Sequence, residues 1–202
     1  IAMCAVTVTG KYISYVTGYY WKIGNYVPCL WIDGKRTDLS VPPSIYAFAS
    51  SVTMANGKVY VTGSYELMIT KPKCIWVDGE REDIESVTWV KATPVPSISV
   101  ENGKPCVAGF QYDGNYYISR LWMDGENIKL TMPRWANQAT VRSVAVENDK
   151  VYAVGYYDNS YHYRACLWID GEYTDLILPE GTTQLEASSV AVTNGNVYAV
   201  GY

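Results

Sequence analysis

A four-residue motif, W-x-D-G, returns along the chain at a nearly constant spacing. Its tryptophans are Trp31, Trp76, Trp122 and Trp168, which lie 45, 46 and 46 residues apart. An Asn-Gly or Asn-Asp pair recurs every 46 residues from Asn56, and a glycine recurs every 45 or 46 residues from Gly18. Three independent markers do not share one period by chance, so the sequence is an array of repeats. We assign residues 1–202 to a single domain, with repeats at approximately 1–47, 48–93, 94–139 and 140–185 and a partial fifth at 186–202.

Each repeat predicts four short β-strands. In the fourth repeat the predicted strands are residues 144–146, 151–156, 165–169 and 173–178. The first two are joined by Asn148-Asp149 and the last two by Asp170-Gly171. Asn-Gly and Asp-Gly pairs between apolar, β-rich runs are strong hairpin signals because such turns need positive φ angles. No window of ten or more residues shows the 3.6-residue apolar period, so we expect almost no helix.

The predicted strands are apolar on both faces. In residues 151–154, V-Y-A-V, neither alternating position is polar, whereas a sheet with one wet face should alternate. Sheets that are buried on both faces need stacked neighbours, and a repeated four-stranded unit of this length is typical of a β-propeller blade. A β-solenoid would have shorter coils, and a β-sandwich would not repeat its sequence. We therefore predict an all-β fold, a β-propeller of four-stranded antiparallel blades.

The partial fifth repeat supplies only two strands, within residues 188–202. The N-terminus already begins with the first strand of a blade, so a strand exchange between the termini does not supply the missing pair. Either the chain is a fragment of a longer propeller, or another chain completes the fifth blade, or that blade stays two-stranded. We favour a fragment or truncated propeller, either five-bladed or part of a larger ring.

The repeat unit resembles a known family of repeats. The segment R-A-C-L-W-I-D-G-E-Y-T-D-L at 164–176, together with N-G-N-V-Y-A-V-G-Y at 194–202, is similar to the bacterial extracellular HAF repeats. Their L-W-x-x-G core matches at Leu30-Trp31, Leu121-Trp122 and Leu167-Trp168, while Arg164-Ala165-Cys166 stands where the family has His-Ala-Phe. The resemblance implies a propeller, often in secreted or surface proteins, and transfers no catalytic residue.

Composition excludes several classes of function. Hydrophobic residues make up 49% of the chain and charged residues 18%, which is typical of a globular protein. The net charge of −4 argues against a nucleic-acid binder that neutralises phosphates. No apolar run approaches the ~20 residues of a membrane span. The cysteines form no C-x-x-C pair, so we expect buried free thiols rather than a metal site at Cys4, Cys29, Cys74, Cys106 and Cys166.

The sequence offers little catalytic chemistry. His162 is the only histidine, and no G-x-S-x-G motif accompanies it, so we expect no catalytic triad, no metal and no cofactor. A glycosidase needs two carboxylates on one pocket, which keeps an enzymatic alternative open. The unrepeated acids that could serve are Glu66, Asp113, Asp158, Glu180 and Glu186.

Residues that recur in every repeat are explained by the repeat itself. The W-x-D-G tryptophans are expected to pack between blades, and their aspartates to shape turns. Asp38, Asp83 and Asp175 recur in the fourth strand, where we expect them to accept hydrogen bonds from backbone or hydroxyl groups. Functional candidates are therefore sought among residues that vary between repeats.

The varying residues fall on one face of the predicted propeller. It should carry the loops 19–26, 64–73, 110–118 and 156–163 and the connections between blades, which hold Tyr46, Gln138 and other polar or aromatic residues. Tyrosine and tryptophan are frequent in binding sites because they combine a large apolar area with a polar tip. The candidate ligand-binding residues are Trp21, Trp89, Trp135, Tyr112, Tyr116, Tyr157 and Asn137.

The first functional hypothesis is a non-enzymatic, lectin-like module that binds a glycan through this face. Sugars have apolar faces that lie on aromatic rings, and their hydroxyls bond to amides and carboxylates. A protein-interaction scaffold using the same face is the first alternative, and a glycoside-active enzyme using loop carboxylates is the second. The expected partners are a glycan or a protein ligand, and a chain that completes the half blade. A secreted or surface location is favoured, while a cytoplasmic one stays open.

Overall fold

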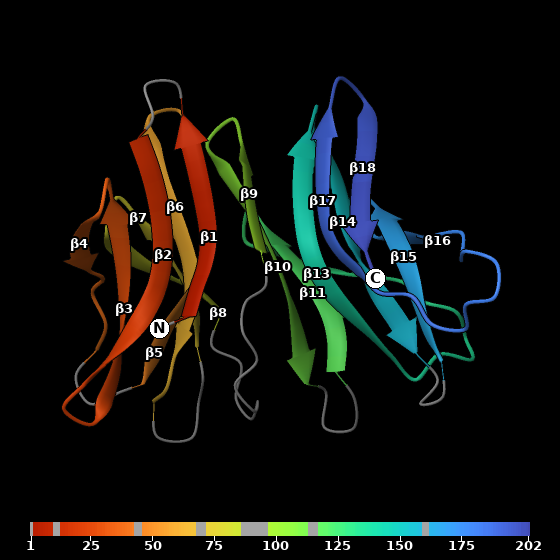
Figure 1. Cartoon of the computed structure of the whole chain (residues 1–202), viewed down its shortest axis with the longest axis horizontal. Coiled ribbons are helices and arrows are strands. Elements are labelled where there is room, and N and C mark those ends of the chain that lie inside the picture. The colour runs from red at the N-terminus through yellow and green to blue at the C-terminus, as the bar shows by residue number, and fades with distance from the viewer. Residues whose placement is uncertain are drawn as a thin grey trace. The chain divides into compact units, whose positions relative to one another are not determined.

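The computed structural model describes residues 2–9, 13–42, 46–67, 72–85, 97–112, 117–158 and 162–202. Within this part of the chain every regular element is a β-strand, as predicted, and no helix is long and apolar enough to cross a membrane. The chain forms two compact units, Ile1–Ile98 and Ser99–Tyr202. Figure 1 shows the strands of each unit as side-by-side antiparallel ribbons.

The first unit contains two four-stranded sheets among its described residues, in the orders β1-β2-β3-β4 and β5-β6-β7-β8. The strands of the first sheet are β1 (Ala2–Thr9), β2 (Ile13–Lys22), β3 (Asn25–Ile32) and β4 (Lys35–Asp38). Those of the second are β5 (Ala47–Ala55), β6 (Lys58–Tyr65), β7 (Lys73–Val77) and β8 (Glu80–Glu85). Each sheet is a simple meander, with every strand paired to its neighbour in sequence.

The second unit contains two more four-stranded meanders and a two-stranded sheet among its described residues. The first meander consists of β9 (Ser97–Glu101), β10 (Lys104–Tyr112), β11 (Tyr117–Met123) and β12 (Glu126–Lys129). The next consists of β13 (Gln138–Glu147), β14 (Lys150–Asp158), β15 (Tyr163–Ile169) and β16 (Glu172–Asp175). The partial fifth repeat forms only the hairpin of β17 (Ala187–Thr193) and β18 (Asn196–Gly201).

The repeated turn residues adopt the backbone conformation that the sequence predicts. Asn56, Asn102, Asn148 and Asn194 all have φ between 51° and 53° in the turn between the first two strands of their sheet. Asp170, in the turn between β15 and β16, has a φ of 50°, and its carboxylate accepts a hydrogen bond from the Val151 amide at 2.9 Å. The aspartate therefore stabilises both the turn and the neighbouring strand, as expected for a repeated structural residue.

Sheets within each unit stack face to face. The first strand of a later sheet contacts the sheet before it: β5 packs on β1, β2 and β3, while β17 packs on β13 and β14. Residues 151–154 of β14 are accordingly buried at both alternating positions, which confirms the two-sided burial read from V-Y-A-V. This stacking, repeated from sheet to sheet, provides the hydrophobic core.

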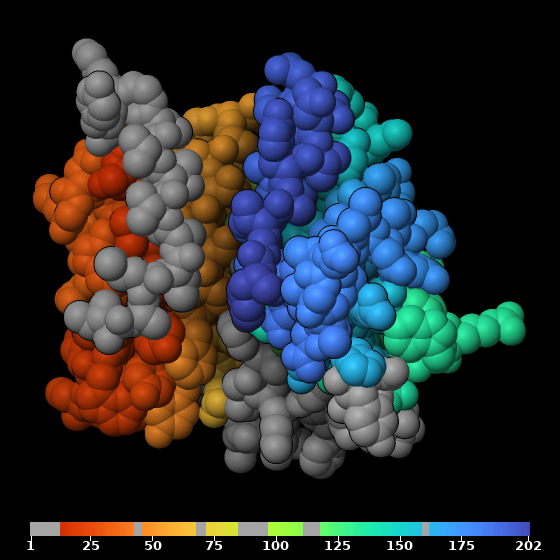
Figure 2. Space-filling view, turned by 45° about the vertical axis from the view of Figure 1, so that its right-hand side comes forward, coloured from red at the N-terminus to blue at the C-terminus, as the bar shows by residue number. Residues whose placement is uncertain are grey.

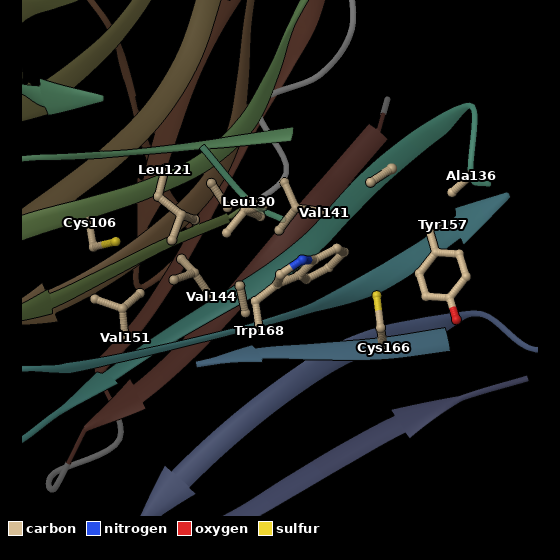
Figure 3. Close-up of a cluster of buried hydrophobic side chains, with 13 residues drawn as sticks. Cys106, Leu121, Leu130, Ala136, Val141, Val144, Val151, Tyr157, Cys166 and Trp168 are labelled. Carbon is tan, nitrogen blue, oxygen red and sulfur yellow. The ribbon is translucent and has the colours of Figure 1, made fainter. Parts of the chain in front are cut away.

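The repeated tryptophan connects stacked sheets. Trp168 of β15 is completely buried among residues that include Leu130, Val141 and Val144 (Figure 3). Its indole N–H donates to the carbonyl oxygen of Thr131, just beyond the last strand of the preceding sheet, at 2.6 Å. In the first unit, Trp76 donates in the same way to the carbonyl of Ser40 at 2.7 Å. These tryptophans pack between sheets, as the repeat predicts.

The cysteines at the repeated strand positions are small buried residues. Cys29, Cys74, Cys106 and Cys166 are free thiols with no exposed surface. Burial raises the pKa of the Cys29 thiol to about 11 and that of Cys106 to about 12, because a thiolate there would lose its hydration. Such thiols are poor nucleophiles, and the expectation of buried free cysteines is confirmed for these four.

Truncation of the inter-sheet tryptophan should destabilise the second unit. Trp168→Ala leaves a cavity, and we expect a loss of about 3–5 kcal/mol in the free energy of unfolding, measured in urea. Trp168→Phe keeps an aromatic ring at this position but leaves the Thr131 carbonyl without its hydrogen-bond donor. We expect this change to lower the free energy of unfolding by about 1–3 kcal/mol. Trp135→Phe, at an exposed position, serves as the control. Equal losses at Trp168 and Trp135 would contradict this role.

Candidate functional site

The strands extend further toward the predicted ligand-binding face than the sequence suggested. Residues 19–22 belong to β2 and 25–26 to β3, so the predicted loop at 19–26 is a tight turn of only Ile23 and Gly24. Likewise, β14 continues to Asp158 and β15 begins at Tyr163. The predicted loops were too long because tyrosine-rich segments have high β-propensity, and paired neighbours let them continue as strands. Trp21, Tyr112 and Tyr157 therefore belong to strands rather than to loops.

In the first unit, Trp21 and Tyr46 form a pair of exposed aromatic rings. Their centroids lie 6.3 Å apart and their planes differ by only 18°, so the rings are nearly parallel. Trp21 is 57% exposed and Tyr46 is 40% exposed. Trp21 is the penultimate residue of β2, whereas Tyr46 immediately precedes β5 of the next sheet. We call these two residues the aromatic ledge.

A second layer of aromatic residues supports the ledge. The ring of Tyr26 lies 5.0 Å from that of Trp21 and 5.8 Å from that of Tyr46. Tyr26 in turn contacts the rings of Tyr19 and Phe48 at 5.3 and 5.2 Å. Because each side chain is held by the next, the ledge is organised before any ligand binds. Of the predicted ligand-binding residues, Trp21 has this environment, and Tyr46 was noted in the sequence as part of a connection between blades.

In the second unit, Trp135 and Asn137 lie in the connection that leads into β13. Both side chains are exposed. The Trp135 ring stands edge-on against the ring of Tyr157, with centroids 5.2 Å apart. The backbone amide of Asn137 donates to the carbonyl of Asp158 at 2.8 Å, and the side-chain amide of Gln138 donates to the Asp158 carboxylate at the same distance. The structure thus brings together Trp135, Asn137 and Tyr157.

Tyr157 is not available to a ligand, and its prediction as a binding residue requires correction. It lies in β14, is 1% exposed, and its hydroxyl donates to the carboxylate of Asp175 at 2.6 Å. Tyr65 donates to Asp83 and Tyr20 to Asp38 in the equivalent way, at 2.7 and 2.8 Å. Tyr157 is therefore a repeated structural residue. The sequence contained a sign of this structural role, because in three of the repeats a tyrosine stands two positions after the repeated glycine of the second strand.

The Tyr–Asp pairs confirm the expectation for the fourth-strand aspartates, which accept hydroxyl hydrogen bonds. Burial and the hydrogen bond to the Asp83 carboxylate raise the pKa of Tyr65 to about 12. In the first sheet, the Arg36 guanidinium lies 4.2 Å from the Tyr20 ring centroid and 3.2 Å from the Asp38 carboxylate. These contacts join the fourth strand of a sheet to its second strand, across the third.

Three predicted residues cannot be placed as side chains. Trp89 and Tyr116 lie outside the described residues, and only the backbone of Tyr112, at the end of β10, is described. Within the described residues no group of three or more histidine, cysteine, aspartate or glutamate side chains is arranged to hold a metal ion. His162, the single histidine, is exposed before β15.

The acids proposed for a glycosidase are partly engaged in structural contacts. Asp158 is buried and accepts the hydrogen bond from Gln138, while Glu186 forms an ion pair with Arg142 at 3.2 Å. Glu66 donates its backbone amide to the carbonyl of Tyr46. Asp113 lies outside the described residues, and Glu180 is exposed. Asp158 and Glu186 therefore take part in contacts of the fold.

No family model and no curated protein matches the sequence. Among solved structures, the chain is similar to the structure of sucrose-6-phosphate hydrolase from Lactobacillus gasseri, with a TM-score of 0.41 and 11% sequence identity. The match covers 96% of this chain and 47% of that chain, so the chain spans about half the length of that protein. Nothing about the function of the chain follows from a likeness of this size.

Replacement of Tyr157 by phenylalanine should affect stability. The Asp175 carboxylate loses a buried donor, so we expect the free energy of unfolding to fall by about 1–3 kcal/mol. Tyr173→Phe is the control, since Tyr173 contacts the same ring but is far more exposed. Urea unfolding of both variants provides the measurement. A Tyr157→Phe protein as stable as the Tyr173→Phe protein would show that the hydroxyl is dispensable for the fold.

The Tyr65–Asp83 pair should make stability sensitive to alkaline pH. The folded-state pKa of Tyr65, about 12, exceeds the unfolded value of 10.0, so the stabilisation is complete below pH 10. It is lost as the pH rises from 10 through 12, because only the unfolded chain then releases the proton readily. Urea midpoints at pH 9 and pH 11.5 should therefore differ less for Tyr65→Phe than for the unchanged protein. If the urea midpoint changed equally between the two pH values in both proteins, the Tyr65 hydroxyl would not be the group responsible.

Proposed function

We propose that the chain is a non-enzymatic binding module that recognises a glycan through the aromatic ledge of Trp21 and Tyr46. The observation that carries the proposal is the pair of exposed, nearly parallel rings at 6.3 Å, held from behind by Tyr26. The C–H face of a pyranose is flat and apolar, and it gains contact area on such rings without displacing tightly held water.

Trp135 and Asn137 are proposed as a second contact region of the same kind on the second unit. An exposed indole beside an exposed amide offers one stacking surface and one hydrogen-bonding group. Trp89, Tyr112 and Tyr116 remain proposals on the sequence pattern alone. We further propose that the stacked sheets are blades of a β-propeller, as the HAF-like repeats imply, and that the protein works outside the cell or on its surface.

The alternative function, a protein-interaction scaffold, is favoured by one specific observation. Ile23, in the turn directly after the end of β2, is 93% exposed. An isoleucine two positions from Trp21 extends the apolar surface beyond the aromatic rings, and contiguous apolar surface is typical of protein interfaces. A sugar lying on Trp21 and Tyr46 gains little from an aliphatic residue, whereas a protein partner gains from burying it. Ile23 therefore discriminates between the two functions.

The experiment is a glycan array followed by calorimetric titration of the best ligand. We expect Trp21→Ala and Tyr46→Ala each to weaken binding at least tenfold, which corresponds to about 1.4 kcal/mol. Both side chains are largely exposed, so melting temperatures should stay within about 2 °C of the unchanged protein. Tyr198→Ala is a matched control, because Tyr198 has the same 57% exposure as Trp21.

The second function has its own expected result. A blank array, together with a protein ligand whose binding falls at least tenfold in both Trp21→Ala and Ile23→Ser, would replace the glycan proposal by the scaffold. Glycan binding that is unchanged in Trp21→Ala and Tyr46→Ala would contradict the ledge as the site. Ile23→Ser alone should leave glycan affinity within about twofold, since ~0.4 kcal/mol is within the range of exposed substitutions.

A further inference from the structure

The strand β18 is an edge strand whose side chains are exposed. Tyr198 and Val200 are 57% and 64% exposed, whereas Tyr152 and Val154, at the same positions of the preceding repeat, are 8% and 0% exposed. In the described sheet of that repeat, β14 lies between β13 and β15, whereas among the described strands β18 pairs with β17 alone. Figure 2 shows the dark blue β17–β18 hairpin uncovered at the surface. One edge of β18 therefore keeps free backbone donors and acceptors.

A cavity of about 510 Å³ lies beside β18. Ala199, Val200 and Gly201 of β18 form one side, and Leu176, Ile177 and Pro179 of the segment after β16 form another. Ala165, Leu185 and Ala187 complete much of its apolar lining. The cavity is thus bounded by a free strand edge and by the sheet that precedes it in the second unit.

The cavity corresponds to the place that the repeated tryptophan fills in the sheet before it. Trp168 shares a buried cluster with Leu130, Ala139, Val141 and Ala153. One repeat of 46 residues later, these four positions are occupied by residues that all line the cavity: Leu176, Leu185, Ala187 and Ala199.

The first unit shows the same arrangement around its buried tryptophan. Trp76 shares a cluster with the residues at the four corresponding positions, Leu39, Ala47, Ala49 and Val61. In both of these sheets a tryptophan side chain fills the equivalent space. The cavity beside β18 therefore has the surroundings of a tryptophan side chain. We call it the tryptophan pocket.

The backbone around the tryptophan pocket already has the geometry of the filled examples. The β17–β18 pair carries a bulge between Ala187 and Ser189, at the position of the bulge between Val141 and Ser143. A Cβ on Gly201 would collide with the carbonyl oxygen of Glu186, just as one on Gly63 would collide with that of Phe48. At Gly63 a Cβ would also meet the Trp76 ring at 2.7 Å, so this glycine makes room for a tryptophan.

A hydrogen-bond acceptor is also in place. Trp76 and Trp168 donate to the carbonyls of Ser40 and Thr131. The equivalent residue in the last repeat is Ile177, which lines the tryptophan pocket and whose side chain is almost fully exposed. Its carbonyl stands at the position of the carbonyls that accept the indole N–H in the two filled examples.

We propose that β18 and the tryptophan pocket bind a β-hairpin of another polypeptide segment that has the pattern small–Leu/Ile–Trp–x–Asp–Gly. The first strand of this hairpin pairs with β18 and adds a third strand to the sheet. The register follows from the complete sheets, in which Cys166 pairs with Gly155 and Trp168 with Ala153. The small residue of the hairpin therefore lies opposite Gly201, and its tryptophan lies opposite Ala199, above the pocket.

A second copy of these 202 residues is a poor donor of this hairpin. In each described four-stranded sheet the third strand is already paired on both sides, for example β15 between β14 and β16. Release of such a hairpin would expose a buried tryptophan in the donor and recreate the same free edge there. A separate segment with the stated pattern carries no such cost. The inference is independent of the glycan proposal, because none of the residues proposed to bind the glycan lines the tryptophan pocket.

The test uses the full chain and a synthetic peptide of residues 162–178, HYRACLWIDGEYTDLIL, labelled with a fluorophore at its N-terminus. We expect saturable binding by fluorescence anisotropy, and slower hydrogen exchange at the β18 amides in the complex. Trp168→Ala in the peptide should weaken binding at least tenfold. The second arm fuses residues 157–178 after Tyr202, where they continue the repeat, and should raise the melting temperature above that of the same fusion with Trp168→Ala.

A matched pair of variants in the protein locates the binding site. Ala199→Arg places a long side chain in the tryptophan pocket at an exposed position, and it should weaken peptide binding at least tenfold without loss of stability. Tyr198→Arg changes the adjacent residue, which points to the opposite face of the strand, and should alter binding less than threefold.

Three outcomes would overturn the proposal. One is that the Trp168→Ala change alters neither the affinity of the peptide nor the melting temperature of the fusion protein. Another is peptide binding that is insensitive to Ala199→Arg. The last is a concentration-dependent dimer of the chain alone that already protects the β18 amides, because a second copy would then be the occupant.

Discussion

The hydrogen bond from a buried tryptophan to the carbonyl at the end of the preceding sheet is the contact on which the stacked arrangement depends. Trp76 and Trp168 each fill the space between two sheets and also satisfy a backbone acceptor, at Ser40 and Thr131. A large apolar ring alone could sit in several orientations, but the indole N–H fixes one. Because the contact occurs in both units, one sheet positions the next within each unit, as in other repeat proteins.

A second set of repeated contacts ties the strands within each sheet. The hydroxyls of Tyr20, Tyr65 and Tyr157 donate to fourth-strand aspartates, and the turn aspartates accept amides of the second strand. Carboxylates at these places satisfy donors that hydrophobic packing cannot. Between sheets, Glu101 accepts the amides of Asn148 and Asp149, and Glu147 accepts those of Asn194 and Gly195. The polar residues of the repeat are therefore structural, and function is sought where the repeat is broken.

The candidate sites arise at two kinds of departure from the repeat. The aromatic ledge exists because Trp21 and Tyr46 are individual substitutions at strand ends, and the neighbouring sheet brings their rings together. The tryptophan pocket is lined by the residues that surround the repeated tryptophan in the complete sheets, and no described tryptophan is among its lining residues. Sequence reasoning included Trp21 but wrongly added Tyr157, since it read a strand position as a loop. It also noted the unfinished fifth repeat, yet the cavity beside β18 emerged only when Leu176, Ala187 and Ala199 were seen together.

The sequence by itself determined the period, the all-β class, the four-stranded meanders, the turns, and the burial of four cysteines and of the repeated tryptophans Trp76, Trp122 and Trp168. These features follow from local φ preferences and from apolar patterns that repeat many times, so each prediction is supported by several copies. Only the tertiary structure decided where strands end and which aromatic side chains remain exposed. Both depend on which neighbouring chain segments cover a residue: Tyr157 is covered by Trp135 and Tyr173 and becomes core, whereas Trp21 stacks on Tyr46 at the surface and stays accessible.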